Sequence, residues 1–266
     1  MGQISDTFEK TRSAGRIALM PYLAVGYPTV ETTLALAPAL ASAGADIFEL
    51  GVPFSDPLAD GATVQHATQI ALRNGVTLTT CLEVAAELRR KLSTPLLLMS
   101  YYNPIAHFGE IAFCTSARLA GVDGLIVPDL PPEEAGDLQE AAKTNGLDLI
   151  YLVAPTSTDD RLETVAHLAS GFVYCVSLAG TTGARSRLAD GLPDYLQRVR
   201  QHVRVPLAVG FGISHPEHVQ TVAAHADGAI VASALIDRLE KTATEDQVAV
   251  AAAYVAELAA ATGRPG

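Results

Sequence analysis

The sequence lacks the features that identify several large classes of protein. No apolar run reaches the roughly 18–20 residues that a transmembrane helix needs, and residues 1–10 contain no apolar core of a secretory signal. No cluster of Lys or Arg interrupts an acidic balance of 18 Lys and Arg against 29 Asp and Glu, a formal net charge of −11. We therefore expect a cytoplasmic protein that binds neither nucleic acid nor membranes.

Cysteine is scarce, and no metal-binding pattern is present. The three cysteines, Cys81, Cys114 and Cys175, are odd in number, far apart and in no CxxC pair. This argues against a disulfide framework or a structural zinc site and indicates a reducing compartment. Two closely spaced histidines, His215 and His218, have no third ligand nearby. We interpret them as polar residues at the start of a surface helix and predict no metal site.

What the sequence does contain is a large apolar fraction in a repeated arrangement. Hydrophobic residues make up 49% of the 266 residues, enough for one sizeable core. Three segments look alike: 43–50 (AGADIFEL), 120–127 (AGVDGLIV) and 224–231 (AHADGAIV). In each, a helical pattern ends in small residues and passes into a short apolar run. This indicates a helix leading into a buried parallel strand.

Strands and helices are predicted to alternate along the chain. Apolar runs predict eight strands, at 18–23, 47–50, 96–100, 124–127, 149–153, 172–177, 207–209 and 229–232. Helical patterns lie between most of them, at 32–43, 79–91, 111–120, 132–145, 159–169 and 216–224. Eight units in this length favour a closed (β/α)8 barrel, the TIM barrel, over an open doubly wound sheet. No strand is followed by GxGxxG, which argues against a dinucleotide-binding fold.

We therefore predict an α/β protein with a single (β/α)8 barrel domain over residues 1–266. An extra N-terminal helix at 5–13, capped by Ser5, is expected to cover one end of the barrel. An alanine-rich helix near 247–261 ends the chain.

Residues that directly follow barrel strands are candidates for catalysis, because active sites of such barrels lie at the C-terminal ends of the strands. Glu49 lies near the end of the second predicted strand, and alternation places it on the same face as Ile47. A carboxyl group there is largely out of water, which raises its pKa and suits proton transfer. We favour this interpretation over a structural Glu paired with a neighbour.

The loop at 51–61 (GVPFSDPLADG) carries two further acids, Asp56 and Asp60. Its glycines and prolines predict a rigid, non-helical segment. Carboxylates around one cavity are typical of acid–base catalysis. The pattern alone leaves open whether one Asp instead caps the following helix while the other is solvated.

Two later loops have the composition of ligand-binding segments. Residues 177–186 (SLAGTTGARS) are small and glycine-rich, which fits either a lid that excludes water or an ordinary surface loop. After the last two strands, Gly212 allows close approach of the backbone and Ser233 offers a hydroxyl. Barrels commonly bind phosphate there. The alternative is close packing of a strand against a helix.

One long motif resembles a known family. The stretch at 48–61, FELGVPFSDPLADG, is similar to the signature of tryptophan synthase α subunits, and YYNP (101–104), VPDLP (127–131), GTTG (180–183) and GFGI (210–213) match in order. The similarity runs from about residue 5 to about residue 240. The resemblance implies a (β/α)8 barrel that cleaves indole-3-glycerol phosphate to indole and glyceraldehyde 3-phosphate, a carbon–carbon lyase of tryptophan biosynthesis.

The resemblance also assigns roles to residues. Glu49 would be the general acid–base and Asp60 the acceptor for the indole N–H. Tyr174 would lie near the substrate. The indole pocket would be lined by Tyr22, Met99, Leu152 and Phe211. Thr182 would close against Asp60, and phosphate would be bound by Gly183, Gly212 and Ser233. No metal or organic cofactor is expected in this chain.

The resemblance further implies a partner, because the family works as an αββα complex with a pyridoxal-phosphate β subunit. The residues expected to face that subunit are Asp56, Asn103, Pro104, Asp129 and Pro131. The segments 103–104 and 130–132 are predicted to be rigid, exposed apolar turns that suit an interface. From the sequence alone, these segments could also be ordinary turns that connect neighbouring elements.

Three other functions compete with this assignment. A stand-alone lyase would use the same site and release free indole. A mainly regulatory subunit, activating a β partner, is suggested by Leu178 and Ala232, where the family often has Arg and Gly. A sugar-phosphate isomerase would share the phosphate end of the barrel, but it would not explain Asp60 or the long motif.

Overall fold

The computed structural model describes residues 2–176, 191–210 and 212–265. Its centre is a closed barrel of eight parallel strands that pair in chain order, with the last strand returning to the first. The strands are β1 (Ala18–Ala24), β2 (Phe48–Gly51), β3 (Leu96–Met99), β4 (Gly124–Ile126), β5 (Asp148–Val153), β6 (Val173–Val176), β7 (Leu207–Gly210) and β8 (Gly228–Val231). This confirms the predicted (β/α)8 barrel and all eight strands.

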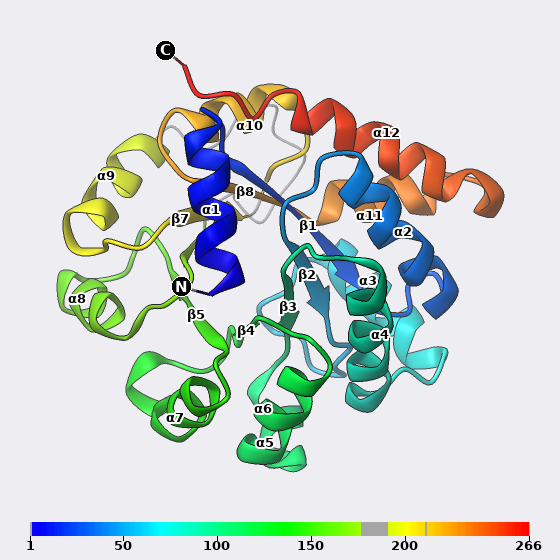
Figure 1. Cartoon of the computed structure of the whole chain (residues 1–266), viewed down its shortest axis with the longest axis horizontal. Helices are drawn as coiled ribbons and strands as arrows, with labels where there is room; N and C mark the ends of the chain where they lie inside the picture. Colours follow the sequence, from blue (N-terminus) through cyan, green and yellow to red (C-terminus); the bar gives the residue numbers. More distant parts are fainter. Residues whose placement is uncertain (1, 177–190, 211, 266) are drawn as a thin grey trace.

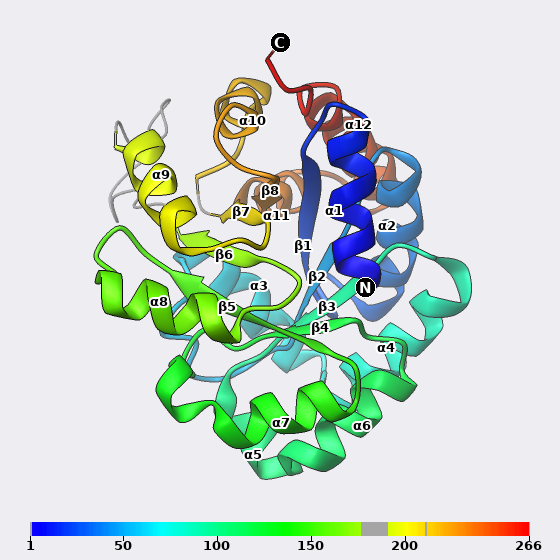
Figure 2. The same cartoon turned by 60° about the vertical axis from the view of Figure 1, so that its left-hand side comes forward.

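Helices surround the barrel in a ring, except the first, which lies across one end, as Figures 1 and 2 show. They are α1 (Gln3–Ser13), α2 (Val30–Ser42), α3 (Ala62–Arg73), α4 (Leu78–Lys91), α5 (Tyr102–Phe108), α6 (Glu110–Leu119), α7 (Gly136–Thr144), α8 (Asp159–Leu168), α9 (Leu192–His202), α10 (Pro216–Ala223), α11 (Ser233–Glu240) and α12 (Gln247–Ala259). The sequence did not predict α3, α5, α9 or α11. The helix predicted at 132–145 is in fact a short 3-10 turn, η1 (Pro132–Glu134), followed by α7.

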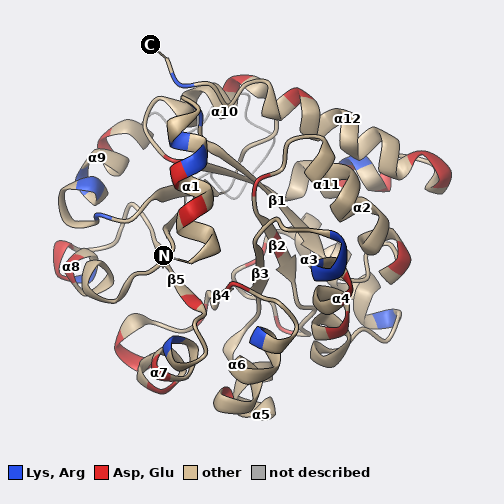
Figure 3. Cartoon of the chain, viewed as in Figure 1, with Lys and Arg blue, Asp and Glu red and all other residues tan. Residues whose placement is uncertain are grey.

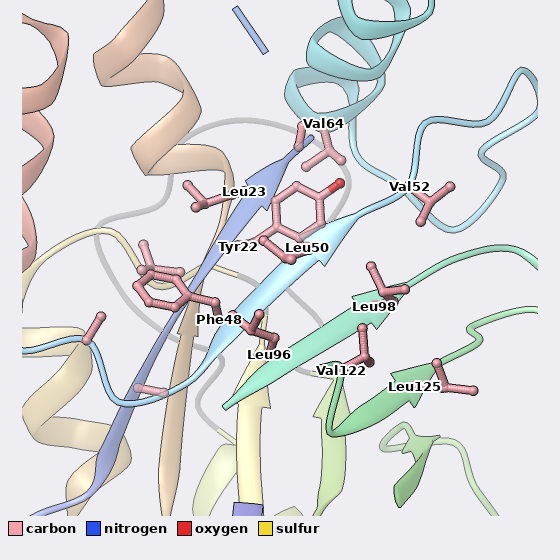
Figure 4. Close-up of a cluster of buried hydrophobic side chains, with 14 of the residues drawn as sticks. Tyr22, Leu23, Phe48, Leu50, Val52, Val64, Leu96, Leu98, Val122 and Leu125 are labelled. Carbon is pink, nitrogen blue, oxygen red and sulfur yellow. The ribbon is translucent and has the colours of Figure 1, made fainter. Parts of the chain in front are cut away.

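The strands divide their side chains between two cores, as the two-residue period requires. Inward side chains such as Ile47, Leu97 and Ile230 fill the barrel, and all three are at most 2% exposed. Outward side chains such as Phe48 and Leu50 pack against the helices, in the cluster that Figure 4 shows. Both faces of each strand are therefore dry, which explains the nearly continuous apolar runs.

Helix α1 closes the N-terminal end of the barrel, as expected. Ile4 and Phe8 belong to the barrel's inner cluster, and the rings of Phe8 and Phe172 lie 5.6 Å apart. The predicted cap was wrong: the helix begins at Gln3 with Gly2 as its N-cap, and Ser5 lies in its first turn. Burying Ile4 against the barrel requires the helix to begin before that residue.

The three similar segments of the sequence share one structural device. Each places an Asp just before a strand, and its carboxylate accepts a backbone N–H from the strand before it. Asp46, Asp123 and Asp227 hold Leu19, Leu96 and Leu207 in this way, at 2.9 Å each. Each Asp also pairs with an Arg: Arg16, Arg89 and Arg200 respectively. Strands β1, β3 and β7 are thus tied to β2, β4 and β8 at the end opposite the predicted active site.

The structure also describes the cysteines, the histidines and the charged residues that the sequence singled out. Cys81, Cys114 and Cys175 are buried free thiols. Within the described ranges there is no metal-binding cluster of three or more ligands, and no helix is long and apolar enough to cross a bilayer. The interpretation of His218 as a surface residue was wrong: it is buried, with Nδ1 3.3 Å from the Ser214 backbone nitrogen. Charged residues lie mainly on the outer helices and loops (Figure 3).

Candidate active site

A cavity of about 200 Å³ opens at the C-terminal ends of the strands. The described residues that line it are Tyr22, Glu49, Asp60, Gly61, Val64, Met99, Tyr174, Gly212, Ile213, Ser214, Ile230, Ala232, Ser233, Ala234 and Asp237. Seven of the predicted site residues therefore meet in one place, although they come from both halves of the chain. They are Tyr22, Glu49, Met99, Asp60, Tyr174, Gly212 and Ser233.

Glu49 lies deep in this cavity. It pairs in register with Tyr22 of β1 and Leu97 of β3, and it is only 1% exposed. Its Oε1 has no hydrogen-bond partner among the described residues. Burial raises its pKa to about 8, so the side chain is mostly a neutral carboxylic acid at pH 7. A group of this kind can deliver a proton to a bound ligand near neutral pH.

Asp60 faces the same cavity from the end of the loop that follows β2. Its backbone carbonyl accepts a hydrogen bond from Gln65 Nε2 at 2.9 Å. Burial raises its pKa to about 6, while a hydrogen bond from Tyr101 opposes that rise. The N-cap of α3 is Gly61, so neither Asp60 nor Asp56 caps that helix. Asp56 is instead exposed to solvent, which was the other alternative left open by the sequence. It accepts a hydrogen bond from the Ser55 hydroxyl.

Two tyrosines contribute hydroxyl groups to the cavity, and two glycines make room for them. A Cβ on Gly51 would lie 2.0 Å from Tyr22 Oη, and a Cβ on Gly210 would lie 2.1 Å from Tyr174 Oη. In Figure 4 the Tyr22 ring lies near the ends of β1 and β2, with its oxygen on the side of Val64. Burial is the main cause that raises the pKa of both tyrosines, and the nearby carboxyl groups raise it further. Their hydroxyls therefore stay protonated and able to donate.

The part of the cavity wall that follows β7 and β8 has the features of an anion site. Gly212 has φ +80°, a left-handed conformation that favours glycine. Ser233 begins α11, so backbone N–H groups of that helix start point toward this wall. The Tyr254 hydroxyl of α12 donates to the Ser214 carbonyl at 3.0 Å, and the Arg238 guanidinium lies 4.0 Å from the Tyr254 ring centroid. The C-terminal helix therefore supports the loop after β7, a role that the sequence did not indicate.

Four predicted site residues are not placed in this cavity. Leu152 packs against the inner core but lines a neighbouring hollow with Val127 and Arg161 rather than the main cavity, because β5 is displaced around the barrel from β1 and β2. Thr182, Gly183 and Phe211 lie outside the described residues, as does the whole glycine-rich loop at 177–186. The lid interpretation of that loop therefore stays a prediction.

The residues predicted to face a partner follow strands β2, β3 and β4 at the same end of the barrel, with Asn103 and Pro104 in the first turn of α5. Asp56, Asn103 and Asp129 are exposed. The predicted exposed turns were wrong in both places. Pro104 stands in the first turn of α5. In the segment at 130–132 the first and last residues are buried and the Pro131 side chain is half-buried, because η1 folds them onto the barrel.

One residue of the site, Tyr101, was not predicted from the sequence. It is 4% exposed, its hydroxyl accepts the Ala59 N–H at 2.8 Å, and its hydroxyl lowers the pKa of the Asp60 carboxyl group. The signal was present, because Tyr101 follows β3 almost directly and catalytic residues of barrels are found after strands. A tyrosine at the end of an apolar run was interpreted only as part of a matching motif.

Comparison with known proteins places the whole chain alongside one family. A family model described as the tryptophan synthase alpha chain matches residues 8–262. A protein named tryptophan synthase alpha chain from Chloroflexus aurantiacus is 56% identical over 266 residues, 100% of both chains. The similarity therefore covers the complete barrel and not only the motif at 48–61.

Solved structures give the same result. The tryptophan synthase subunit alpha of Legionella pneumophila is 36% identical, with a TM-score of 0.91 over 98% of each chain. A chain in a structure of Mycobacterium tuberculosis tryptophan synthase is 38% identical, with a TM-score of 0.91 over 99% of each chain. Sequence and architecture thus agree along nearly the whole length.

Proposed function

The chain belongs to the tryptophan synthase alpha chain family, a family of lyases in tryptophan biosynthesis, and on that premise we propose that it cleaves indole-3-glycerol phosphate to indole and glyceraldehyde 3-phosphate. The observation that carries the proposal is the meeting of Glu49 and Asp60 in one cavity with Gly212 and Ser233, the residues expected to bind phosphate. The two carboxyl groups have different pKa values, about 8 and about 6. Groups whose pKa values are separated in this way suit an acid and a base in one site.

Glu49 would act first as an acid. It delivers its proton to C3 of the indole ring, which converts the ring into a cation that can accept electrons. The resulting Glu49 carboxylate then takes the proton from the hydroxyl group on the adjacent side-chain carbon. The carbon–carbon bond breaks, its electron pair returns to the ring, and the hydroxyl oxygen becomes the aldehyde oxygen. No net proton is consumed, and no electron is gained or lost.

Asp60 would stabilise the cation. Its carboxylate is largely ionised at pH 7, and in the proposed geometry it accepts the indole N–H while positive charge develops on that nitrogen. Tyr22, Met99 and Tyr174 would enclose the ring. This chemistry uses no metal or organic cofactor.

The phosphate group would bind at the part of the cavity wall after β7 and β8, on Gly212 and Ser233. As part of this proposal, Gly183 would also bind the phosphate, and Phe211 would line the indole pocket. Thr182 would close against Asp60.

The family implies a beta-subunit partner. We propose an αββα assembly in which the β subunit holds pyridoxal phosphate and receives the indole. Asp56, Asn103, Pro104, Asp129 and Pro131 would face it. A regulatory subunit with decayed catalysis gains no support from a cavity that keeps both carboxyl groups. A stand-alone lyase would use the same cavity, and neither it nor a sugar-phosphate isomerase is favoured by the family match. The cytoplasmic location stays a prediction.

The central test is Glu49→Gln. The amide cannot give or take the proton, so indole release from indole-3-glycerol phosphate should fall by roughly 10²–10⁴-fold, the usual contribution of a general acid–base. The matched control is Glu83→Gln on the exposed side of α4, which should keep full activity. Rates should be measured with and without the β subunit, together with urea unfolding. Substantial turnover in a folded Glu49→Gln variant would remove Glu49 from the reaction.

A further inference from the structure

The Tyr101 side chain connects two loops at the mouth of the barrel. It follows β3 as the N-cap residue of α5, and its hydroxyl reaches the loop that follows β2. There it accepts the Ala59 N–H at 2.8 Å. It also lies near enough to the Asp60 carboxyl group to lower the pKa of that group. Tyr101 thus fixes the backbone directly before Asp60 and acts on its carboxyl group.

Tyr101 is fixed from several sides. Its ring stacks on Phe54 at the start of the same loop, with centroids 5.2 Å apart and planes 29° apart. The next residue, Tyr102, donates its N–H to Asp129 Oδ1 at 2.9 Å, and Ser100 N–H donates to the Ile126 carbonyl at 3.0 Å. The loops after β3 and β4 therefore hold Tyr101, and Tyr101 holds the loop that carries Asp60.

The surroundings of Asp60 explain why a hydrogen bond to its carboxylate would matter. Among the described residues that line the cavity there is no Lys or Arg. The charged or titratable groups around it are Glu49 on β2, Asp237 on α11, Tyr22 on β1, Tyr174 on β6 and Tyr101 after β3. A carboxylate in such a site depends on hydrogen bonds from neutral donors, because burial favours its protonated form.

We propose that Tyr101 is a positioning residue, whose hydroxyl holds the Asp60 carboxylate toward the bound indole nitrogen. This inference rests on the proposed function, since it assigns a task to a group that assists Asp60. Tyr101 itself does not line the cavity, so its effect is exerted through Asp60 and not through contact with the ligand.

The test is Tyr101→Phe in the full-length chain, assayed with the β subunit. The ring and its stacking remain, but Asp60 loses a hydrogen bond that lowers its pKa. The acid limb of kcat/KM for indole release should move up by about 1 pH unit, as expected for the loss of one hydrogen bond to a charged group. Above that limb kcat should fall about tenfold, because Asp60 is less well aimed.

The neighbouring tyrosine supplies the matched control. The Tyr102 hydroxyl donates to Glu110 at 2.8 Å, on the outer side of α5. Tyr102→Phe loses one tyrosine hydrogen bond as well, and it should leave both the acid limb and kcat unchanged. Equal profiles for Tyr101→Phe and Tyr102→Phe would overturn the inference. If Tyr101→Phe does not fold, Phe54→Leu, which keeps the hydroxyl but removes the stacking, should shift the limb in the same direction by less, and no shift would count against the inference.

A second measurement separates this inference from the proposed function. Titration of Asp side-chain carboxyl groups by ¹³C NMR, with Asp60 assigned through Asp60→Asn, reports its pKa without any turnover. If the wild-type chain releases no indole, the proposed function fails, whereas a higher Asp60 pKa in Tyr101→Phe still supports the contact. An unchanged Asp60 pKa overturns the inference even if the chain is an active lyase.

Discussion

At the scale of single residues, burial gives two similar side chains different charge states. Glu49 is fully enclosed and has no hydrogen-bond partner at Oε1 among the described residues, whereas Asp60 has a hydroxyl donor. Burial alone therefore raises the pKa of Glu49 to about 8, while the hydrogen bond from Tyr101 limits that of Asp60 to about 6. Near pH 7 the cavity holds one neutral acid and one anion.

This difference predicts a bell-shaped pH dependence of kcat/KM for indole release. Activity should fall below about pH 6, where Asp60 takes up a proton, and above about pH 8, where Glu49 loses the proton that it must donate. Because the two groups share a cavity, the limbs report the pair and not isolated residues. Initial rates should be measured at subsaturating substrate across this range. A flat profile, or an acid limb that persists in Asp60→Asn, would contradict the assignment.

At the scale of elements, strands were easier to predict than helices. Each strand lies between the inner core and the helix layer, so its apolar run is visible in the sequence. Four helices, α3, α5, α9 and α11, were not predicted. None of them begins with a side-chain cap hydrogen bond, but neither do α6, α7 and α10, which were predicted. The missing cap signal therefore does not explain why these four were missed.

The Asp residues before β2, β4 and β8 lead to a prediction about elements. Burial favours neutral Asp227, but hydrogen bonds from Arg200, Leu207 N–H and Arg264 outweigh it and lower the pKa. Asp227→Asn should lower the free energy of unfolding by about 2–3 kcal/mol at pH 7, as expected when a partly buried ion pair loses its charge. Because the folded-state pKa is lowered, this stabilisation is present above the unfolded-state pKa and disappears as pH falls through the folded-state value.

Urea unfolding of wild type and Asp227→Asn at several pH values would check this. Asp159→Asn is the control, because Asp159 is 64% exposed in its pair with Arg198 and such pairs contribute little. A difference between wild type and Asp227→Asn that grows toward low pH would refute the account.

At the scale of the whole molecule, the two ends of the barrel differ in what they expose. Leu58 is 94% exposed in the loop after β2, at the end that holds the cavity. Leu119 is 83% exposed at the end of α6, which leads to the start of β4 and so lies at the opposite end. An exposed Leu close to Asp56 suits the centre of an interface. The sequence alone did not indicate a role for Leu58.

If the cavity end faces the β subunit, Leu58→Ser should weaken binding of that subunit about tenfold or more, the loss typical of an apolar anchor. Leu119→Ser, equally apolar and similarly exposed, should leave the affinity unchanged. Titration calorimetry with the β subunit and size-exclusion chromatography would measure both. Equal weakening by the two variants would place the interface elsewhere. Failure of the wild-type chain to bind, together with fast cleavage by the chain alone, would favour the stand-alone lyase.

The sequence by itself determined the eight strand–helix units, from which the closed barrel was predicted, and the face that Glu49 shares with Ile47. That shared face follows from a period of two residues, which is a local property of a strand and can be read without knowing its neighbours. The long motif at 48–61 further identified the family, and it contains both carboxyl groups of the site, Glu49 and Asp60.

Only the tertiary structure decided which side chains meet. That Asp60 turns into the cavity, that Tyr101 holds it, and that Leu152 belongs to a neighbouring hollow depend on loops packed against other loops. Contacts between segments far apart in the chain set those directions, and the residues involved carry no periodic signal. The two pKa values likewise follow from the depth of burial, which exists only once the barrel has closed around the site.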